Sequence, residues 1–461
     1  MFETRTYVRR RRLLKKQVGS GLILFPGNAE SPMNYPANGY PFRQDSSFLY
    51  FFGLDGPGLA GLIDIDADRE LLFGNDVDLE DIIWTGPQPL IAERAAKVGI
   101  RETARKDGLG EVLKAALAKK RKIHYLPPYR ADQAQAIATW MGIPVPRVGV
   151  GASVDLIRAE VAQRSVKSAE EVAEIEAALS ILCPAYFAAM HMARAGKTET
   201  YVLGAMEGIT RSLGASWAFP PIVTVNGHIF HNLGAGNVLS RGRILVADTG
   251  VESPLHYACD VTRSIPVGGR FNRRQRDIYE AVLSVQMEAI RAIRPGARYR
   301  DVHLAAARNV AERLKDLKLM KGDAAEAVAA GAHALFFPHG LGHMLGLDVH
   351  DMEGLGENHV GYDDSVRRSS QFGLAYLRMA RELRPGHVLT VEPGIYFIPA
   401  LIDDWRARSR FTEFIDYDRV EAFRDFGGIR IEDDVLVTDR GRRVLGPPIP
   451  KTVADVEEAA A

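Results

Sequence analysis

Four acidic residues and one histidine in the second half of this 461-residue chain constrain its fold more than any other feature. They are Asp248, Asp260, His343, Glu392 and Glu432, and each lies in a short segment whose chemistry suits a metal ligand. Four carboxylates cannot stay ionised in one pocket unless cations neutralise them, because like charges at short range oppose ionisation. If these residues meet, the chain must fold so that several separate segments surround bound metal.

The two aspartates lie in strand-like segments joined by a turn. Asp248 ends the apolar run RILVAD, and Asp260 begins the next strand-like stretch, DVTR. Gly250 and Pro254, which lie between them, are typical hairpin punctuation. We therefore expect both carboxylates to point from neighbouring strands into one site.

The two glutamates lie within apolar runs that are typical of buried strands. Glu392 lies in VLTVEPGIY and Glu432 in GIRIEDDV. A buried carboxylate is costly unless it is paired or bound to metal. Taken singly, each acid could instead be the inner partner of an arginine, and Arg430 beside Glu432 is such a candidate. His343 lies in a glycine-rich loop with several histidines, although a single loop histidine is more often only hydrogen-bonded.

The donor set as a whole favours a two-metal hydrolase. Carboxylate oxygens with a single nitrogen suit Mn²⁺, Co²⁺, Fe²⁺ or Zn²⁺, and the absence of thiolate ligands argues against a structural zinc site. Paired ions about 3.5–4 Å apart are typical of enzymes that activate water for attack on a carbonyl carbon.

The order of these residues, within DTG…DVTR, HGLGHMLGLDVHD, LTVEPGIYF and GIRIEDDV, closely resembles the proline-specific branch of the pita-bread metallopeptidases. That branch contains Xaa-Pro dipeptidases (prolidases) and Xaa-Pro aminopeptidases (aminopeptidase P). FRQDSSF and YFFG resemble the N-terminal domain of those enzymes, and RSVKS resembles the start of their catalytic domain. The resemblance implies an α/β (α+β) protein with an N-terminal α/β domain over residues 1–160 and a pita-bread catalytic domain over residues 161–461.

The resemblance also implies roles for individual residues. Asp248 would chelate one metal, Asp260 and Glu432 would bridge both, and His343 with Glu392 would complete the second. Glu392 would also be the general base that takes a proton from water. The remaining matches are His231 and His350 as pocket histidines that orient substrate and steady the oxyanion, His339 as a further pocket histidine, and Arg430 as the partner of a ligand carboxylate.

Two long insertions, residues 352–380 and 398–426, make the chain more similar to a dipeptidase than to a compact bacterial aminopeptidase P. The first contains LAYLRMAR (residues 374–381), which is expected to be helical and resembles the segment whose arginine grips the C-terminal carboxylate of a dipeptide. Arg378 matches that arginine. The alternative is a solvated stripe of Arg378, Arg381 and Arg384 on one helix flank. Dipeptidase is the expected activity; aminopeptidase P and a non-catalytic pita-bread binding protein are the alternatives.

Two departures from the family concern the pocket wall. The hairpin between Asp248 and Asp260 is one residue longer than the resemblance leads us to expect, so a β-bulge is predicted there. Phe219 stands where the family often has a tyrosine near the amino end of the substrate. Loss of that hydroxyl would weaken recognition of the substrate N-terminus.

The composition of the chain bears on its expected binding partners and its expected cellular compartment. Lys and Arg together number 58, as do Asp and Glu, so no global field favours nucleic acid or an anionic membrane. No stretch has the roughly 18–20 uninterrupted apolar residues of a membrane span. The chain has only 2 cysteines, which argues against a disulfide framework and makes a cytoplasmic location the default expectation. The resemblance implies a proline-containing di- or oligopeptide as the substrate and suggests a homodimer or homotetramer.

Local patterns predict several elements outside the motifs. Short apolar runs are expected as strands at residues 21–25, 61–65, 71–73 and 122–126, with a helix at 111–121. A capping box at Ser168 and Glu171 predicts the start of a long helix, and residues 272–294 predict a second amphipathic helix. The basic run Arg9–Arg12 is interpreted as a solvated helix face rather than a secretory signal.

Overall fold

The computed structural model describes residues 1–234 and 236–461, and the chain forms two compact units. The first contains residues 1–164 and the short segment 353–359; the second contains residues 165–352 and 360–461. The sequence places the domain boundary after residue 160, which lies inside the last helix of the first unit, α8 (Val154–Arg164). The division into domains 1–160 and 161–461 stays a prediction.

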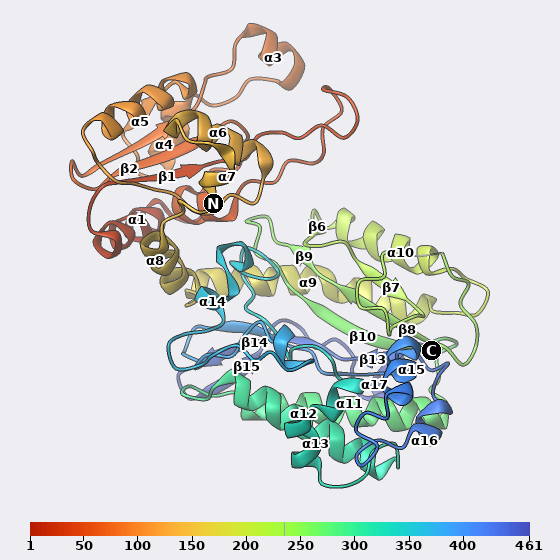
Figure 1. Ribbon diagram of the computed structural model, residues 1–461. Helices are drawn as coiled ribbons and strands as arrows, with labels where there is room; N and C mark the ends of the chain where they lie inside the picture. Colours follow the sequence, from red (N-terminus) through yellow and green to blue (C-terminus); the bar gives the residue numbers. More distant parts are fainter. Residues whose placement is uncertain (235) are drawn as a thin grey trace. The chain divides into compact units, whose positions relative to one another are not determined.

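The first unit is built on one mixed sheet with the strand order β4-β3-β2-β1-β5 (Figure 1). The central strand β1 pairs antiparallel with β2 and parallel with β5, so the predicted α/β layer is confirmed. Apolar side chains of the sheet pack against α5 and α6 in one buried cluster that includes Leu24, Leu62 and Leu113. Its strands are β1 (Leu22–Pro26), β2 (Ala60–Asp64), β3 (Arg69–Phe73), β4 (Glu102–Ala104) and β5 (Ile123–His124). Its helices before α8 are α1 (Thr4–Val18), α2 (Ser46–Phe52), α3 (Leu79–Thr85), α4 (Ile91–Lys97), α5 (Leu109–Ala118), α6 (Ala131–Met141) and α7 (Val145–Val148).

The basic N-terminal run is helical, as α1, but its interpretation as a wholly solvated face is wrong. Arg11 is fully buried and donates to Glu70 at 2.7 Å and to two backbone carbonyl oxygens. Arg10 is also buried, with its guanidinium 3.8 Å from the centroid of the Tyr50 ring. Arg10 Nη1 also donates to the Tyr50 backbone oxygen at 2.9 Å, so both buried charges interact with groups elsewhere in the chain.

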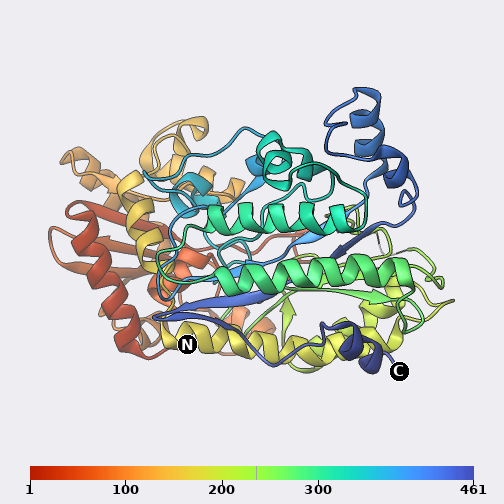
Figure 2. The ribbon, with the colours of Figure 1, turned by 90° about the horizontal axis from the view of Figure 1, so that it is seen from below.

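The second unit contains two pairs of long helices, α9 with α10 and α11 with α12, whose members pack on each other. Figures 1 and 2 show α11 and α12 side by side. The capping box at Ser168 and the start of the second predicted helix at Asn272 are confirmed. The helices are α9 (Ala169–Met192), α10 (Glu199–Ser212), α11 (Arg273–Ala292), α12 (Tyr299–Asp316), α13 (Ala324–Ala330), α15 (Pro399–Ala407), α16 (Tyr417–Glu421) and α17 (Val453–Ala459); α14 (Glu357–Val360) begins in the segment grouped with the first unit.

The strands of the second unit form small antiparallel sheets that hold the candidate ligands. Their orders are β10-β8-β7 and β11-β14-β15, with β12-β13 and β6-β9 as two-stranded pairs. The strands are β6 (Ser216–Trp217), β7 (Ile222–Thr224), β8 (Ile244–Thr249), β9 (Val251–Glu252), β10 (Val261–Pro266), β11 (Val388–Val391), β12 (Gly394–Tyr396), β13 (Gly428–Arg430), β14 (Asp433–Thr438) and β15 (Gly441–Val444). A bridge between Thr262 and Glu432 joins the first sheet to the segment before β14.

The hairpin between Asp248 and Asp260 does not contain the predicted bulge. Thr249 stands opposite Val261, and Glu252 stands opposite Ala258 in the same register. The additional length of the hairpin therefore lies in the turn, residues 253–257. His256 in this turn adopts a left-handed φ of 65°. The pocket wall keeps an undistorted ladder next to Asp248.

One helix, α9, is long and apolar enough to pass a length-and-composition test for a membrane span. Of its most apolar window, 44% is buried inside the fold. The apolar side chains of Val172, Ile175, Leu179 and Leu182 are buried, as in a core helix. The buried core helix of a soluble protein can have the same length and composition.

Candidate active site

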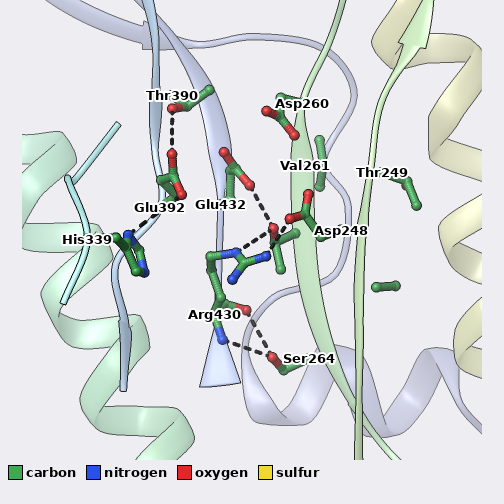
Figure 3. A network of polar contacts seen from close by, with 12 residues as sticks. Asp248, Thr249, Asp260, Val261, Ser264, His339, Thr390, Glu392, Arg430 and Glu432 are labelled. Carbon is green, nitrogen blue, oxygen red and sulfur yellow. Dashed lines mark hydrogen bonds and ion pairs between the residues drawn. The ribbon is translucent and has the colours of Figure 1, made fainter. Parts of the chain in front are cut away.

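Three of the five candidate ligands form a tight buried group in the second unit. One ligand atom from each of Asp260, His343 and Glu432 lies within 4.8 Å of the others. These residues are 5%, 5% and 2% exposed. Asp248 and Glu392 lie beside them, and Figure 3 shows the four carboxylates converging from separate segments of the chain.

Each glutamate lies at a break between two short strands rather than inside one continuous strand, which corrects the expectation from sequence. Glu392 follows β11 and precedes Pro393 and β12. Glu432 lies between β13 and β14. Proline at residue 393 cannot donate to a ladder, so the strand must be interrupted there. The break releases each glutamate from the regular alternation of the sheet and lets its side chain enter the site.

His343 is fixed so that one ring nitrogen faces the carboxylates. Its Nδ1 lies 3.0 Å from the backbone oxygen of Met344, to which it donates a hydrogen bond. Nε2 then lies 3.4 Å from Asp260 Oδ2 and 3.7 Å from Glu392 Oε1. A histidine whose Nδ1 proton is bound by the backbone presents Nε2 as an unprotonated metal ligand.

Residues two positions from the ligands hold the carboxylates in place. Thr262 Oγ1 donates to Glu432 Oε2 at 2.6 Å, and Thr390 Oγ1 lies 3.3 Å from Glu392 Oε1. Arg430 pairs with the Asp248 carboxylate and donates to Thr262, as predicted for a partner of a ligand carboxylate. Residues two apart share a face of an extended chain, so the spacing is the signal that could have identified both threonines.

Burial and mutual repulsion dominate the electrostatics of the group. They raise the pKa of Asp260 and of Glu432 well above the ordinary carboxyl value. Burial also raises the pKa of Glu392, against the opposing effects of His343 and Arg430. These shifts favour the protonated forms while no counter-charge is present, whereas divalent cations would favour the ionised forms.

The residues present therefore fit a metal centre. Asp260 Oδ1 is buried and has no hydrogen-bond partner within the described part of the chain. A buried carboxylate oxygen without a donor costs free energy unless it binds a cation. The donor set of oxygens and one imidazole nitrogen suits first-row divalent ions.

A cavity of about 1060 Å³ opens beside the group, and all of its lining residues belong to the second unit. Every residue that the sequence assigned to the site lines it: Phe219, His231, Asp248, Asp260, His339, His343, His350, Arg378, Glu392, Arg430 and Glu432. Apolar side chains form much of the remaining wall, among them Phe230, Phe372 and Leu401. The sequence assignment of one common site is thus matched by the geometry.

The three predicted pocket histidines have different surroundings. His350 lies with its ring centroid 4.2 Å from that of His343, and His231 is exposed at the cavity wall. His339 Nδ1 donates to the Gly340 oxygen, and Nε2 accepts from the Tyr396 hydroxyl, both at 2.8 Å. Burial lowers the pKa of His339 to about 3, so its ring is neutral. Tyr396, which also accepts from Arg430, is a site residue that the sequence reasoning missed.

The expected helix at residues 374–381 is wrong. Only Leu374–Tyr376 form a single 3₁₀ turn, and the following residues are irregular. The Tyr362 hydroxyl donates to the Leu377 oxygen at 2.7 Å, and the amides of Ala380 and Arg381 donate to the Gly361 oxygen. The backbone oxygen and amides that would form the hydrogen bonds of a helix are therefore bound to other parts of the chain.

Arg378 lies in this irregular segment and lines the cavity. Its neighbours Leu377 and Met379 are 2% and 1% exposed, so they anchor the chain on either side. Arg378 itself is half-buried and is one of the residues that line the cavity. A solvated helical stripe of arginines does not exist, because the segment is not a helix.

The loop that carries His350 is tied to the start of the second unit by a buried ion pair. Lys167 Nζ lies 2.7 Å from Asp351 Oδ2, and each side chain is 1% exposed. Gly346 packs directly against the Asp351 carboxylate, so that an added Cβ would lie 2.5 Å from Asp351 Oδ2. The RSVKS segment therefore anchors the residue next to His350.

We expect Lys167→Met to destabilise the second unit. Removing one partner of a buried ion pair costs roughly 3–5 kcal/mol, because the other charge stays buried. The thermal unfolding midpoint of this unit should fall by several degrees. Lys122→Met is the control, since the Lys122–Asp155 pair is 60% and 58% exposed and should contribute little. Equal shifts in the two variants, measured by calorimetry, would contradict this role of Lys167.

Comparisons with known proteins agree with this geometry. Residues 173–439 match the model of metallopeptidase family M24, and residues 7–125 match the aminopeptidase P N-terminal domain. The chain belongs to metallopeptidase family M24 and is a peptidase. The predicted fold class, an N-terminal α/β domain followed by a pita-bread catalytic domain, is confirmed.

Relatives of both predicted kinds are found. Human Xaa-Pro dipeptidase is 31% identical over 456 residues, which cover 96% of this chain and 89% of that protein. A probable Xaa-Pro aminopeptidase of Aspergillus clavatus is 34% identical over 432 residues, covering 91% and 89%. The structure of Pseudomonas aeruginosa aminopeptidase PepP superposes with a TM-score of 0.81 at 28% identity, covering 100% of this chain and 98% of that one. Zinc-substituted Escherichia coli aminopeptidase P in complex with product gives 0.81 at 27% identity, with the same coverage.

Proposed function

We propose that this peptidase is a Xaa-Pro dipeptidase that uses two divalent metal ions. The observation that carries the proposal is the position of Arg378, which lines the same cavity as the five candidate ligands. A guanidinium at that point pairs with a carboxylate in a planar, bidentate manner and suits a substrate that ends directly after proline. The 31% identity to human Xaa-Pro dipeptidase over 456 residues supports the same assignment.

The candidate ligands would hold the ions as the resemblance implies, with Asp260 and Glu432 shared between them. When bound, the ions would neutralise the buried carboxylates and lower the pKa of a water molecule at the site. Glu392 would accept the proton of that water during attack on the peptide carbonyl. Arg430 holds the Asp248 carboxylate, and Thr262 and Thr390 hold those of the two glutamates, so the ligands are oriented before substrate binds.

The pocket histidines would act on the substrate. His231 and His350 line the cavity and would donate hydrogen bonds to the carbonyl oxygen as negative charge develops on it. His339 would act through Tyr396, because both of its ring nitrogens are already engaged. Phe219, at the cavity wall, would pack against the amino end of the substrate without donating a hydrogen bond.

Mn²⁺ is the ion we propose, with Co²⁺, Zn²⁺ and Fe²⁺ as alternatives that the same donor set accepts. We propose further that the protein is a cytoplasmic homodimer or homotetramer that binds neither nucleic acid nor membrane. Its equal numbers of basic and acidic residues support the absence of a nucleic-acid partner.

Aminopeptidase P is the second candidate, and the size of the cavity favours it. A volume of about 1060 Å³ exceeds the usual range for small-molecule pockets of roughly 300–1000 Å³, so a longer peptide could enter. The Pseudomonas aeruginosa and Escherichia coli structures that superpose over the full chain are aminopeptidases P.

A substrate-length series with Mn²⁺ supplied distinguishes the two candidates. We expect the wild-type enzyme to hydrolyse Ala-Pro with a much higher kcat/KM than Ala-Pro-Ala. A tripeptide places its carboxylate one residue further on, beyond the point at which the Arg378 guanidinium would bind it. A wild-type preference for the tripeptide would assign the protein to the aminopeptidases.

Arg378→Ala should lower kcat/KM for Ala-Pro by about two to three orders of magnitude. Removing one partner of a buried charged pair costs roughly 3–5 kcal/mol, and about 1.4 kcal/mol corresponds to tenfold. Hydrolysis of Ala-Pro-Ala should change little. Arg384→Ala is the matched control, because Arg384 is exposed on the same segment and does not line the cavity. Equal losses on both substrates would mean that Arg378 is only structural.

A further inference from the structure

Glu199, the first residue of α10, has a buried carboxylate that the proposed chemistry does not use. It is 0% exposed, although an acid at a helix N-terminus usually faces solvent and interacts with the helix dipole. Its oxygens accept no hydrogen bond from the amides of its own helix among the described contacts; Thr198 caps that helix instead. The hydrogen bonds of Glu199 go to another part of the chain.

The partners of Glu199 lie at residues 225 and 237, on either side of a segment whose described residues, 225–234 with 236 and 237, we name the His231 loop. Val225 N donates to Glu199 Oε1 at 2.7 Å at one end. Asn237 donates at the other end, through its backbone N to Oε2 at 3.0 Å and through Nδ2 to both oxygens. The backbone N of Glu199 also donates to the Asn237 oxygen at 3.0 Å. One carboxylate thus closes the loop that carries Phe230 and His231, both of which line the cavity.

A second chain of contacts runs from Glu199 into the middle of the loop. Thr224 Oγ1 donates to Glu199 Oε1 at 3.1 Å. The same hydroxyl accepts from Asn226 N and from Asn232 Nδ2, each at 3.0 Å. A hydroxyl has one donor and two acceptor sites, so all three are used and its orientation is determined. Asn232 is the residue next to His231.

We propose that Glu199 is a positioning residue, which holds His231 at the cavity wall through Thr224 and Asn232. The proposal rests on the proposed role of His231 toward substrate. A carboxylate is required at this point because it faces only donors: a hydroxyl, two backbone amides and a side-chain amide. A neutral glutamine would turn one of its own N–H groups toward these donors and leave at least one of them unsatisfied. His231, which is itself exposed, would then lose its fixed position.

Two variants and one control separate positioning from general stability. Glu199→Gln removes the charge with little change in size, and Thr224→Val removes only the hydroxyl that links Glu199 to Asn232. Thr210→Val is the control, since Thr210 is a buried threonine of the same helix whose hydroxyl donates to the Glu207 backbone oxygen within α10. We expect Glu199→Gln and Thr224→Val to lower kcat/KM for Ala-Pro by about 10- to 100-fold, with metal content and the control unchanged.

The role of His231 in this loss is tested in a second background. In His231→Ala protein, Glu199→Gln and Thr224→Val should cause no further loss, because effects of residues that act as a unit are not additive. If both substitutions lower kcat/KM by the same factor with and without His231, Glu199 acts by another route and the proposal is overturned.

A readout that needs no turnover completes the experiment. The chain has 12 histidines, and the ¹³Cε1 NMR signal of His231 in selectively labelled protein is identified by its absence in His231→Ala. We expect this signal to shift or broaden in Glu199→Gln and in Thr224→Val and to stay in place in Thr210→Val. An unmoved signal in Thr224→Val overturns the proposal even if Glu199→Gln fails to fold. Failure of the wild type to cleave Ala-Pro would overturn the proposed function, while this signal would still decide the role of Glu199.

Discussion

Glu392→Gln should lower kcat for Ala-Pro by about 10²–10⁴-fold while metal stays bound. Glutamine keeps the size of the side chain and one oxygen that can coordinate, but it cannot accept a proton from water, and positioned general bases contribute a factor of this size. Glu392 is well placed for this role, with Oε1 3.7 Å from His343 Nε2 and within hydrogen-bond reach of Thr390. The measurement is kcat together with the metal content of the same sample.

The matched control for this substitution is Glu382→Gln, because Glu382 is exposed ten positions earlier and does not line the cavity. We expect that variant to have wild-type activity. Near wild-type turnover of Glu392→Gln with full metal content would require another group to act as the base.

Dialysis against a chelator should abolish hydrolysis, and Mn²⁺ or Co²⁺ should restore it. Without cations, the pKa values of Asp260 and Glu432 are raised by burial and by the neighbouring carboxylates, so the group would be protonated or its side chains would move apart. Neither state can bind substrate and activate water. Undiminished activity in protein shown by elemental analysis to contain no transition metal would contradict the assignment of a metallopeptidase mechanism.

Removal of the metal should also lower the stability of the protein. A ligand that binds only the folded state raises the unfolding midpoint. We expect the thermal midpoint of the second unit to fall on dialysis and to recover with Mn²⁺. Dialysis and Mn²⁺ should change the thermal midpoint of the Asp260→Asn variant little, because that variant lacks one of the proposed shared metal ligands.

The sequence predicted those parts of the fold that depend on local patterns. The strands β1, β2, β3 and β5 of the first unit and the starts of α9 and α11 were found from apolar runs and capping residues, because these signals act over a few positions. The short strand β4 was not predicted. The burial of Arg11 could not be predicted, since its partner Glu70 lies 59 positions away. The helix expected at residues 374–381 failed for the same reason: Gly361 and Tyr362 take its backbone hydrogen bonds.

The sequence also identified the residues of the cavity, but not how they are held. Each ligand lies in a recognisable motif, so the set could be assembled without coordinates, and all of its members line one cavity. The support of Glu432 by Thr262 crosses between sheets and joins residues 170 positions apart. No sequence pattern indicated a special role for Glu199, because a glutamate at the start of a helix is common. Only the structure shows that its side chain is buried against the His231 loop.

The number of metal ions that the folded protein binds tests the central claim most directly. Apoprotein would be reloaded with Mn²⁺, freed of excess ion and examined by elemental analysis beside the Asp260→Asn and Glu432→Gln variants. Two ions per chain are expected in the wild type, with fewer in each variant, because both residues are proposed to bind both ions. Wild-type protein that retains no metal, or variants that retain as much as the wild type, would contradict the account of Asp248, Asp260, His343, Glu392 and Glu432 as a two-metal centre.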